Sequence, residues 1–426
     1  MRRFVFLDTL EYGKQKKKHV WSSNKTSEVR ETERELRIEL QPTSPLRLRL
    51  LDGKAEIFGY ELPHKVWITF PPLMTFAVFT WYGATIEIDG ITGNEYISCE
   101  TPMVNYLGLH NSLQEGPRVI IVGDIDSGKS TLAKMLLNWA VKDGWKPTFV
   151  DLNVGQSSIT IPGTIAAAPI KMLVDPVEGF PLDKALIHYF GLTNPSVNLR
   201  LYRTLVEELA RELKEEFSAN AESRASGMVI DTMGFIVREG YALLLHAIRT
   251  FNASLVIVVG QEEKLVYDLK KNLKFKKNLQ VLNLEKSEGV FSRSSDFRKT
   301  LRNSNIQNYF YGVTNDLTVY TKTVKFSDVQ VYRIGDFRVS CSTSAHQRGN
   351  DPLKITLVTI DEHLVNKVLA ISYAIKPDQI ISSIVAGFVC IKNVDISEER
   401  ITYVSPSAAE LPSKILILGT LTWHVT

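Results

Sequence analysis

Apolar and polar residues alternate in the first quarter of the chain. Between about residues 31 and 96, short segments such as LRIEL, LRLRLL and ATIEIDG follow one another, with Gly, Pro or Asp between them. Alternation with a period of two is typical of strands with one buried face, and strands at this spacing favour a small sandwich or barrel. We predict an N-terminal β-sandwich domain at residues 27–106, preceded by a basic tail at residues 1–26.

The pattern changes after about residue 103. Continuous apolar runs, PRVIIVG, KPTFVDL, GMVIDT and SLVIVVG, now alternate with amphipathic stretches such as STLAKMLLNWAVKDG and VEELARELKEEF. Such alternation favours a parallel sheet with helices on both faces. From about residue 313 strands return, among them VQVYRIG, RITYVS and KILILGTLTW. We therefore predict an α/β domain at residues 107–311 and a mainly-β C-terminal domain at residues 312–426. The last should pack on the central domain or bind partners.

The stretch GDIDSGKST, at residues 123–131, fits the P-loop pattern G-x-x-x-x-G-K-[ST] between a buried strand and a helix. In such a loop the backbone N–H groups cradle phosphates, while a lysine reaches the terminal phosphates and a hydroxyl binds Mg²⁺. This makes the central domain a P-loop NTPase domain. The predicted nucleotide-binding residues of the loop are Gly123, Asp124, Ile125, Asp126, Ser127, Gly128, Lys129, Ser130 and Thr131.

Two carboxylates offer the acid that a P-loop enzyme requires, because each ends a predicted strand. Asp151 ends FVD, and Asp231 ends MVID. Either could bind Mg²⁺ with Ser130 or accept a proton; equally, aspartate at a strand end can serve only as a turn or cap residue. For the metal we select Ser130 and Asp151.

A basic segment, SRSSDFRKTLR, places Arg293, Arg298 and Arg302 in a predicted helix. Such a helix could close over a transferring phosphate, whose oxygens carry the developing charge. The alternative is a solvated basic face.

Composition narrows the class of protein. The chain of 426 residues is 44% hydrophobic, carries a formal net charge of +3 and has three cysteines. Its length indicates two or three domains, and its near-neutral charge requires any nucleic acid to bind a local basic surface. No uncharged run reaches the roughly 18 residues of a membrane span. The cluster KQKKK at residues 14–18 could be a nuclear address, a phosphate-contacting arm or a solvated tail.

Taken together, these motifs resemble the eukaryotic RNA 5′-hydroxyl kinases of the pre-mRNA 3′-end cleavage complex. The resemblance spans nearly the whole chain in order. It is carried by AEIFGYEL, AVFTWYG, ETPMVNYL, the P-loop, DLNVGQSSITIPGT, HYFGLTNPSVNLRLY, RSSDFR, IQNYFYG, VKFSDVQVYRIG and LPSKILIL.

The resemblance implies an activity: transfer of the γ-phosphate of ATP, with Mg²⁺, to the 5′-hydroxyl of RNA. It also implies a nuclear protein that acts as a monomer within the cleavage complex and, in animal members, with the tRNA-splicing endonuclease. By position, Lys129 and Ser130 would bind phosphate and Mg²⁺, and Arg293 and Arg298 would be lid arginines. Three further residues take family roles: Glu35 at the nucleotide, and Gln156 and Thr193 at the RNA.

Three departures from the family pattern bear on turnover. Asn153 stands where active members carry the second aspartate of D-x-D-x-G-Q, and Thr75 replaces a lysine near adenine. Phe235 replaces a tryptophan that stacks on the terminal RNA base, and phenylalanine can still stack there with less area. An asparagine cannot accept the hydroxyl proton, so Asp151 or Asp231 would have to compensate. Two readings stay open: an RNA 5′-hydroxyl kinase, or an ATP-bound scaffold of the cleavage complex. A GTPase is disfavoured because the N-K-x-D motif is absent.

Overall fold

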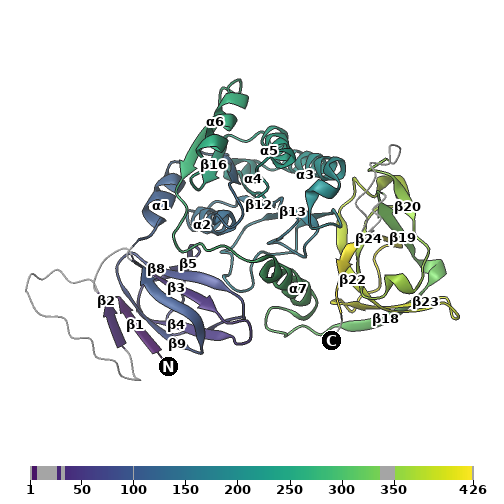
Figure 1. Ribbon diagram of the computed structural model, residues 1–426, viewed down its shortest axis with the longest axis horizontal. Helices are drawn as coiled ribbons and strands as arrows, with labels where there is room; N and C mark the ends of the chain where they lie inside the picture. The colour runs from purple at the N-terminus through teal and green to yellow at the C-terminus, as the bar shows by residue number, and fades with distance from the viewer. Residues whose placement is uncertain (1, 7–25, 30–33, 99, 336–350, 425–426) are drawn as a thin grey trace, which may run out of the picture.

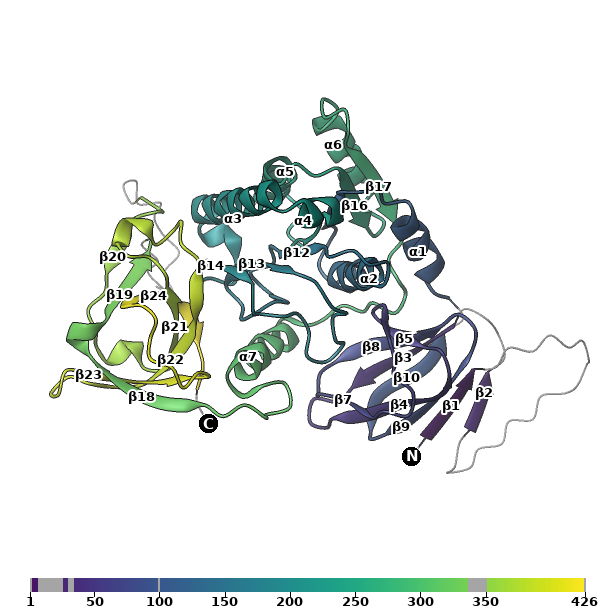
Figure 2. The same ribbon diagram turned by 180° about the vertical axis from the view of Figure 1, so that it is seen from behind.

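The computed structural model describes residues 2–6, 26–29, 34–98, 100–335 and 351–424. The basic cluster at residues 14–18 lies outside them. Figures 1 and 2 show a central α/β domain with a β domain on either side. This arrangement confirms the predicted fold class. Among the described residues, no helix has the length and apolar character that a membrane crossing requires.

The N-terminal domain is a sandwich of two five-stranded sheets, ordered β2-β1-β9-β4-β7 and β10-β3-β8-β5-β6. Alternate residues of the strands, such as Leu36, Ile38 and Ile86, form the core between them. The first strand lies inside the stretch that we predicted to be a tail, and it pairs with β9. The strands are β1 (Arg2–Phe6), β2 (Thr26–Val29), β3 (Arg34–Leu40), β4 (Leu46–Gly53), β5 (Glu56–Ile57), β6 (Tyr60–Glu61), β7 (Ile68–Phe70), β8 (Thr75–Thr80), β9 (Ala84–Asp89) and β10 (Thr92–Ser98).

The central domain is built on a seven-stranded sheet in the order β14-β13-β12-β15-β11-β16-β17. Its strands are β11 (Arg118–Val122), β12 (Thr148–Asp151), β13 (Thr164–Pro169), β14 (Leu186–Tyr189), β15 (Met228–Asp231), β16 (Leu255–Val259) and β17 (Gln280–Leu284). The five strands from β12 to β17 in this order are parallel. However, β13 runs antiparallel to both β12 and β14. The predicted parallel arrangement holds for these five strands, and the antiparallel β13, which the sequence did not indicate, makes the sheet mixed.

Helices cover both faces of this sheet, with α2 on one face and α3 and α5 on the other (Figures 1 and 2). The helices are α1 (Met103–Asn111), α2 (Lys129–Lys142), α3 (Leu199–Ala219), α4 (Ala221–Ser226), α5 (Glu239–Thr250), α6 (Glu263–Asn272) and α7 (Ser295–Tyr311), with a 3₁₀ turn η1 at Pro195–Val197. The boundary that we placed between residues 106 and 107 falls inside α1. Because Met103, Tyr106 and Leu109 are buried in the central core, α1 packs as part of the central domain.

The C-terminal domain is one seven-stranded sheet, ordered β18-β23-β22-β21-β24-β19-β20. One face packs on the central domain, where the Trp423 ring stacks on Phe310 with centroids 4.6 Å apart and Thr420 N–H donates to the Gly191 carbonyl at 2.8 Å. The elements are β18 (Tyr320–Lys325), η2 (Phe326–Asp328), β19 (Gln330–Ile334), β20 (Ile355–Leu357), η3 (Glu362–Leu364), β21 (Lys367–Ser372), η4 (Pro377–Gln379), β22 (Val385–Asp395), β23 (Arg400–Ser405) and β24 (Ile415–Thr422).

Candidate active site

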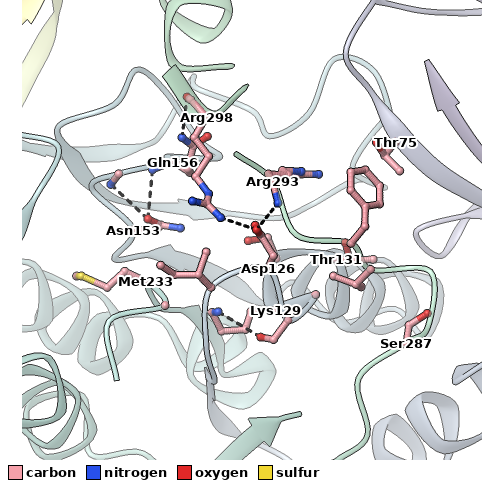
Figure 3. A pocket seen from close by; sticks show the side chains of 18 of the residues that line it. Thr75, Asp126, Lys129, Thr131, Asn153, Gln156, Met233, Ser287, Arg293 and Arg298 are labelled. Carbon is pink, nitrogen blue, oxygen red and sulfur yellow. Dashed lines mark hydrogen bonds and ion pairs between the residues drawn. The ribbon is translucent and has the colours of Figure 1, made fainter. Parts of the chain in front are cut away.

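A cavity of about 530 Å³ opens where the N-terminal domain, the P-loop and α7 meet (Figure 3). Its described lining residues run from Glu35 to Arg302, so the C-terminal domain supplies none of them. Positive charge predominates, which suits a polyphosphate ligand. The charged lining residues are the basic Arg37, Lys129, Arg293, Arg298 and Arg302 and the acidic Glu35 and Asp126.

The P-loop joins β11 to α2, and Gly128 caps the helix with a φ of 92°, in the left-handed region that glycine adopts readily. Lys129 folds back over the loop: its Nζ donates to the carbonyls of Gly123 at 3.1 Å and Asp124 at 2.5 Å and to Ser127 Oγ at 3.3 Å. Burial lowers its pKa. Of the nine predicted loop residues, all but Gly123 and Asp124 are among those that line the cavity.

The Ser130 hydroxyl lies 2.5 Å from Asp231 Oδ2. Asp231 ends β15, the strand beside β11, and burial raises its pKa. Its second oxygen, Oδ1, is buried and has no hydrogen-bond partner within the described chain. A hydroxyl and a carboxylate with a spare oxygen suit Mg²⁺. The described residues contain no group of three or more His, Cys, Asp or Glu side chains that could hold a metal, so phosphate oxygens and water would complete the coordination.

Asp151, which we selected with Ser130 for Mg²⁺, is placed differently. It lies opposite Asp231 in the register of β12 and β15, but its carboxylate accepts hydrogen bonds from its own loop. The donors are Asn153 N at 2.9 Å, Ser157 Oγ at 3.2 Å and Ser158 N at 2.5 Å. Burial and, second, the charge of Asp231 raise the pKa of Asp151 to about 7. Neither aspartate is among the lining residues, but Asp231 contacts Ser130 and keeps an oxygen without a partner within the described chain, so the geometry favours Asp231 as the partner of Ser130.

The residues that the resemblance assigns to RNA, Gln156, Thr193 and Phe235, all line the cavity, as does Asn153. Asn153 Oδ1 accepts the backbone N–H groups of Gly155 and Gln156, each at 3.2 Å. Gln156 Nε2 donates to the Arg298 carbonyl at 3.0 Å and so connects this loop to α7 (Figure 3).

The three arginines line the cavity, but they do not share one helix. Ser294 caps α7 by accepting the N–H of Phe297 at 3.1 Å, so the helix begins at Ser295 and Arg293 precedes it. The prediction that Arg293 is helical was wrong. Asp126 of the P-loop accepts the Arg293 N–H at 2.8 Å and lies 2.5 Å from Arg298 Nη2 (Figure 3). The P-loop thus holds the start of α7 through one carboxylate.

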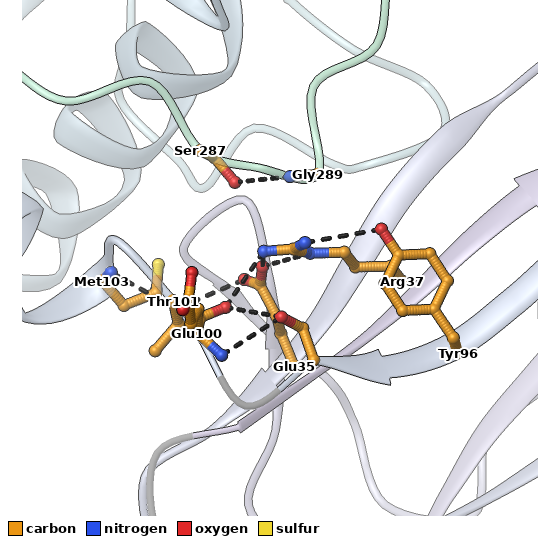
Figure 4. A network of polar contacts seen from close by, with 9 residues as sticks. Glu35, Arg37, Tyr96, Glu100, Thr101, Met103, Ser287 and Gly289 are labelled. Carbon is orange, nitrogen blue, oxygen red and sulfur yellow. Dashed lines mark hydrogen bonds and ion pairs between the residues drawn. The ribbon is translucent and has the colours of Figure 1, made fainter.

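The N-terminal domain closes the cavity with a buried ion pair that sequence reasoning found only in part (Figure 4). Arg37 Nε donates to Glu35 Oε1 at 2.6 Å, and Thr101 Oγ1 donates to Glu35 Oε2 at 3.3 Å. Burial raises the pKa of Glu35 against the opposing effect of Arg37. A Cβ on Gly289 would lie 2.7 Å from Arg37 Nε, so glycine allows this close approach of the domains. Strand alternation places Glu35 and Arg37 on one face, a signal that could have revealed Arg37.

Three protein-family models match the chain in order. The N-terminal beta-sandwich domain of polyadenylation factor matches residues 31–117, and the mRNA cleavage and polyadenylation factor CLP1 P-loop matches residues 123–312. The third, pre-mRNA cleavage complex II protein Clp1, matches residues 317–424.

Known proteins resemble the chain over nearly its full length. Protein CLP1 homolog 5 of Arabidopsis thaliana is 95% identical over 413 residues, covering 93% of this chain and 97% of that protein. The polyribonucleotide 5′-hydroxyl-kinase Clp1 of Homo sapiens is 37% identical, covering 91% and 94%. A solved structure of a Clp1p–Pcf11p complex matches with a TM-score of 0.81 at 24% identity, covering 92% and 96%, and supports the fold. The chain therefore belongs to the Clp1 family of pre-mRNA cleavage complex proteins.

Proposed function

We propose that this protein is an ATP-dependent kinase that transfers the γ-phosphate of ATP to the 5′-hydroxyl end of RNA. We also propose that it acts in the nucleus, as a single copy within the pre-mRNA cleavage complex. One observation carries the kinase proposal: the P-loop, whose Ser130 is hydrogen-bonded to the buried Asp231, lines one cavity with Arg293, Arg298 and the residues assigned to RNA. Animal relatives that are named polyribonucleotide 5′-hydroxyl kinases support it.

In this proposal the P-loop backbone and Lys129 bind the β- and γ-phosphates of ATP. Ser130 and Asp231 hold Mg²⁺, which neutralises charge on the phosphates. Binding of ATP draws Lys129 Nζ away from the loop carbonyls that it now contacts, because a phosphate oxygen is a stronger acceptor for an ammonium group. Glu35 and Arg37 form the wall of the nucleotide site on the N-terminal domain.

The RNA end enters at the part of the cavity formed by Asn153, Gln156, Thr193 and Phe235, which we call the acceptor end. The 5′-oxygen forms a bond to the γ-phosphorus while the bond to the β-phosphate oxygen breaks and ADP leaves. Arg293 and Arg298 stabilise charge on the transferred group. The hydroxyl proton passes to water or to a phosphate oxygen, because the Asn153 amide cannot accept it. Positioning and charge stabilisation supply most of the acceleration in such transfers.

The test is labelling of a 5′-hydroxyl oligoribonucleotide with γ-labelled ATP and Mg²⁺. The wild-type protein should label it, and Lys129→Ala should not. Absence of labelling by a folded protein that binds ATP would remove the kinase proposal.

A second candidate, an ATP-bound scaffold without turnover, is favoured by Asn153 alone. In that case ATP stabilises the fold by mass action, and the protein organises other subunits. A Pcf11p partner in the similar solved structure supports cleavage-complex subunits as partners under either candidate; the tRNA-splicing endonuclease is a further proposed partner. If the wild type binds ATP without transfer while Asn153→Asp transfers, the scaffold is the correct choice.

A further inference from the structure

The orientation of the Asn153 amide is fixed by its own loop. Two backbone N–H groups, of Gly155 and Gln156, point at its Oδ1. An amide NH₂ group at the position of Oδ1 would place a hydrogen-bond donor against these two donors, so the amide oxygen must lie there. The Nδ2 group therefore lies on the opposite side, and Figure 3 shows it directed away from the loop amides. Asn153 lines the cavity, so this position offers the cavity a hydrogen-bond donor.

The charged groups nearest the acceptor end are arginines and hydrogen-bonded carboxylates, and its other polar groups, the Gln156 amide and the Thr193 hydroxyl, are neutral. Arg298 and Arg302 line the cavity, and the Arg298 carbonyl accepts a hydrogen bond from Gln156 of the acceptor end. The Asp151 carboxylate accepts three hydrogen bonds from its own loop, and Asp231 accepts from Ser130. Asp126 is held by Arg293 and Arg298. The two described carboxylates that line the cavity, Glu35 and Asp126, are each paired with an arginine, so neither is free to accept a proton at the acceptor end.

The two possible RNA ends differ in what they require from such a site. A 5′-hydroxyl donates one hydrogen bond and needs an acceptor for its proton. A 5′-phosphate presents only acceptor oxygens and carries negative charge, which amide and guanidinium donors match. An aspartate at position 153 would place a second carboxylate oxygen where Nδ2 now lies, and that oxygen would repel a phosphate.

We propose that the acceptor end binds a 5′-phosphorylated RNA end in preference to a 5′-hydroxyl end, and that Asn153 determines this specificity. The inference rests on the proposed function, since it takes the acceptor end to be the site of an RNA 5′ terminus. It adds that the product of phosphoryl transfer is retained. The protein thereby distinguishes phosphorylated from unphosphorylated ends, and release of the phosphorylated RNA limits turnover.

Binding of two oligoribonucleotides that differ only at the 5′ end tests the inference. Fluorescence anisotropy is measured with Mg²⁺ and without nucleotide, so that no transfer occurs in either direction. The wild type should bind the 5′-phosphorylated strand about 10-fold more tightly, the range of one charge-assisted hydrogen bond. Asn153→Asp keeps an oxygen for the two loop N–H groups and should abolish or reverse the preference. Asn278→Asp, at an exposed position outside the cavity, adds the same charge and should leave the preference unchanged.

Equal affinity of the wild type for both strands overturns the inference, as does an equal effect of Asn153→Asp on both. If such a protein still labels a 5′-hydroxyl strand with ATP, the proposed function stands and this inference alone fails. If the wild type binds ATP but neither strand and transfers nothing, both fail.

Discussion

The two ends of the cavity are built in different ways. The P-loop end consists of nine consecutive residues, the six that join β11 to α2 and the first three of α2. Its main polar groups are already paired with loop carbonyls or with Asp231. The acceptor end combines residues from the loops after β12, β14 and β15 and lies beside the arginines of α7. Its described side chains include no carboxylate. The P-loop end binds phosphate mainly through backbone N–H groups, so it tolerates changes of most of its side chains. The acceptor end binds through side chains from several loops, so one substitution can change its chemistry without any change in the fold.

The largest effect should come from the P-loop end. Lys129→Ala removes the cation that contacts the terminal phosphates, so transfer to a 5′-hydroxyl RNA should fall by at least about 10²–10³-fold, the scale for loss of one preorganised charge donor. ATP affinity should fall as well. Labelling assays and ATP titration measure the two effects, and the thermal midpoint without nucleotide checks the fold. Transfer within a few-fold of the wild type would show that the loop does not bind the transferred phosphate.

The second-largest effect should come from Arg298, which contacts Asp126 at the P-loop end and Gln156 at the acceptor end. Arg298→Ala removes a guanidinium group from the cavity, and transfer should fall by about 10²-fold, with a much smaller change in ATP affinity, because the developing charge lies on the transferred group. Lys299→Ala, a charge removal at an exposed neighbouring position outside the cavity, is the matched control. If Arg298→Ala weakened only ATP binding, Arg298 would belong to the P-loop end alone.

The same contrast explains what the sequence could predict. The P-loop was predictable because its residues are adjacent, and local backbone geometry determines what they do. Ser130 and Asp231 are 101 positions apart in the chain. The sequence showed that Asp151 and Asp231 each end a strand, but it could not show which of the two contacts Ser130. The two aspartates are direct neighbours in the register of parallel strands. They differ in their hydrogen-bond partners, because N–H groups of the turn after β12 donate to the Asp151 carboxylate.

Contacts between domains were harder to predict. Arg37 belongs to a strand of another domain, and its place in the cavity depends on how closely the segment at Gly289 approaches it. For Arg293, the pattern of charges suggested a helix, but Ser294 caps α7, which therefore begins at Ser295, two residues after Arg293. Asn153 was recognisable as a substitution within the family pattern; that its nitrogen faces the cavity follows only from the two loop N–H groups.

A smaller effect would test the choice between the two aspartates. Asp231→Asn should raise the Mg²⁺ concentration needed for half-maximal transfer by about 10-fold, the lower range for changes around a metal ligand. Asp151→Asn, on the neighbouring strand, should shift it by less than about 2-fold, because its carboxylate is held by its own loop. A Mg²⁺ titration of both variants at saturating ATP decides. A larger shift of this Mg²⁺ concentration in Asp151→Asn than in Asp231→Asn would show that Asp151 holds the metal.

The smallest effect is on stability and depends on pH. Because the pKa of Asp151 is raised to about 7 in the folded protein, the folded state keeps a proton that the unfolded state releases near pH 4. The contribution of Asp151 to the free energy of unfolding is thus fully present below about pH 4 and is lost as pH rises toward 7, with a slope of at most about 1.4 kcal/mol per pH unit.

Asp151→Asn should remove this slope, while the mismatch of its amide with the Ser158 N–H lowers stability by an amount that does not vary with pH. Urea unfolding of both proteins at several values between pH 4 and 8 measures the difference. The carboxyls of Asp231 and Glu35 also have raised pKa values, but they are present in both proteins and largely cancel. Parallel pH profiles for wild type and variant would mean that the three loop donors outweigh burial and keep Asp151 ionised. An ionised Asp151 beside Asp231 would then add a negative charge behind the Mg²⁺ position, and the contrast between the two aspartates would be one of access alone.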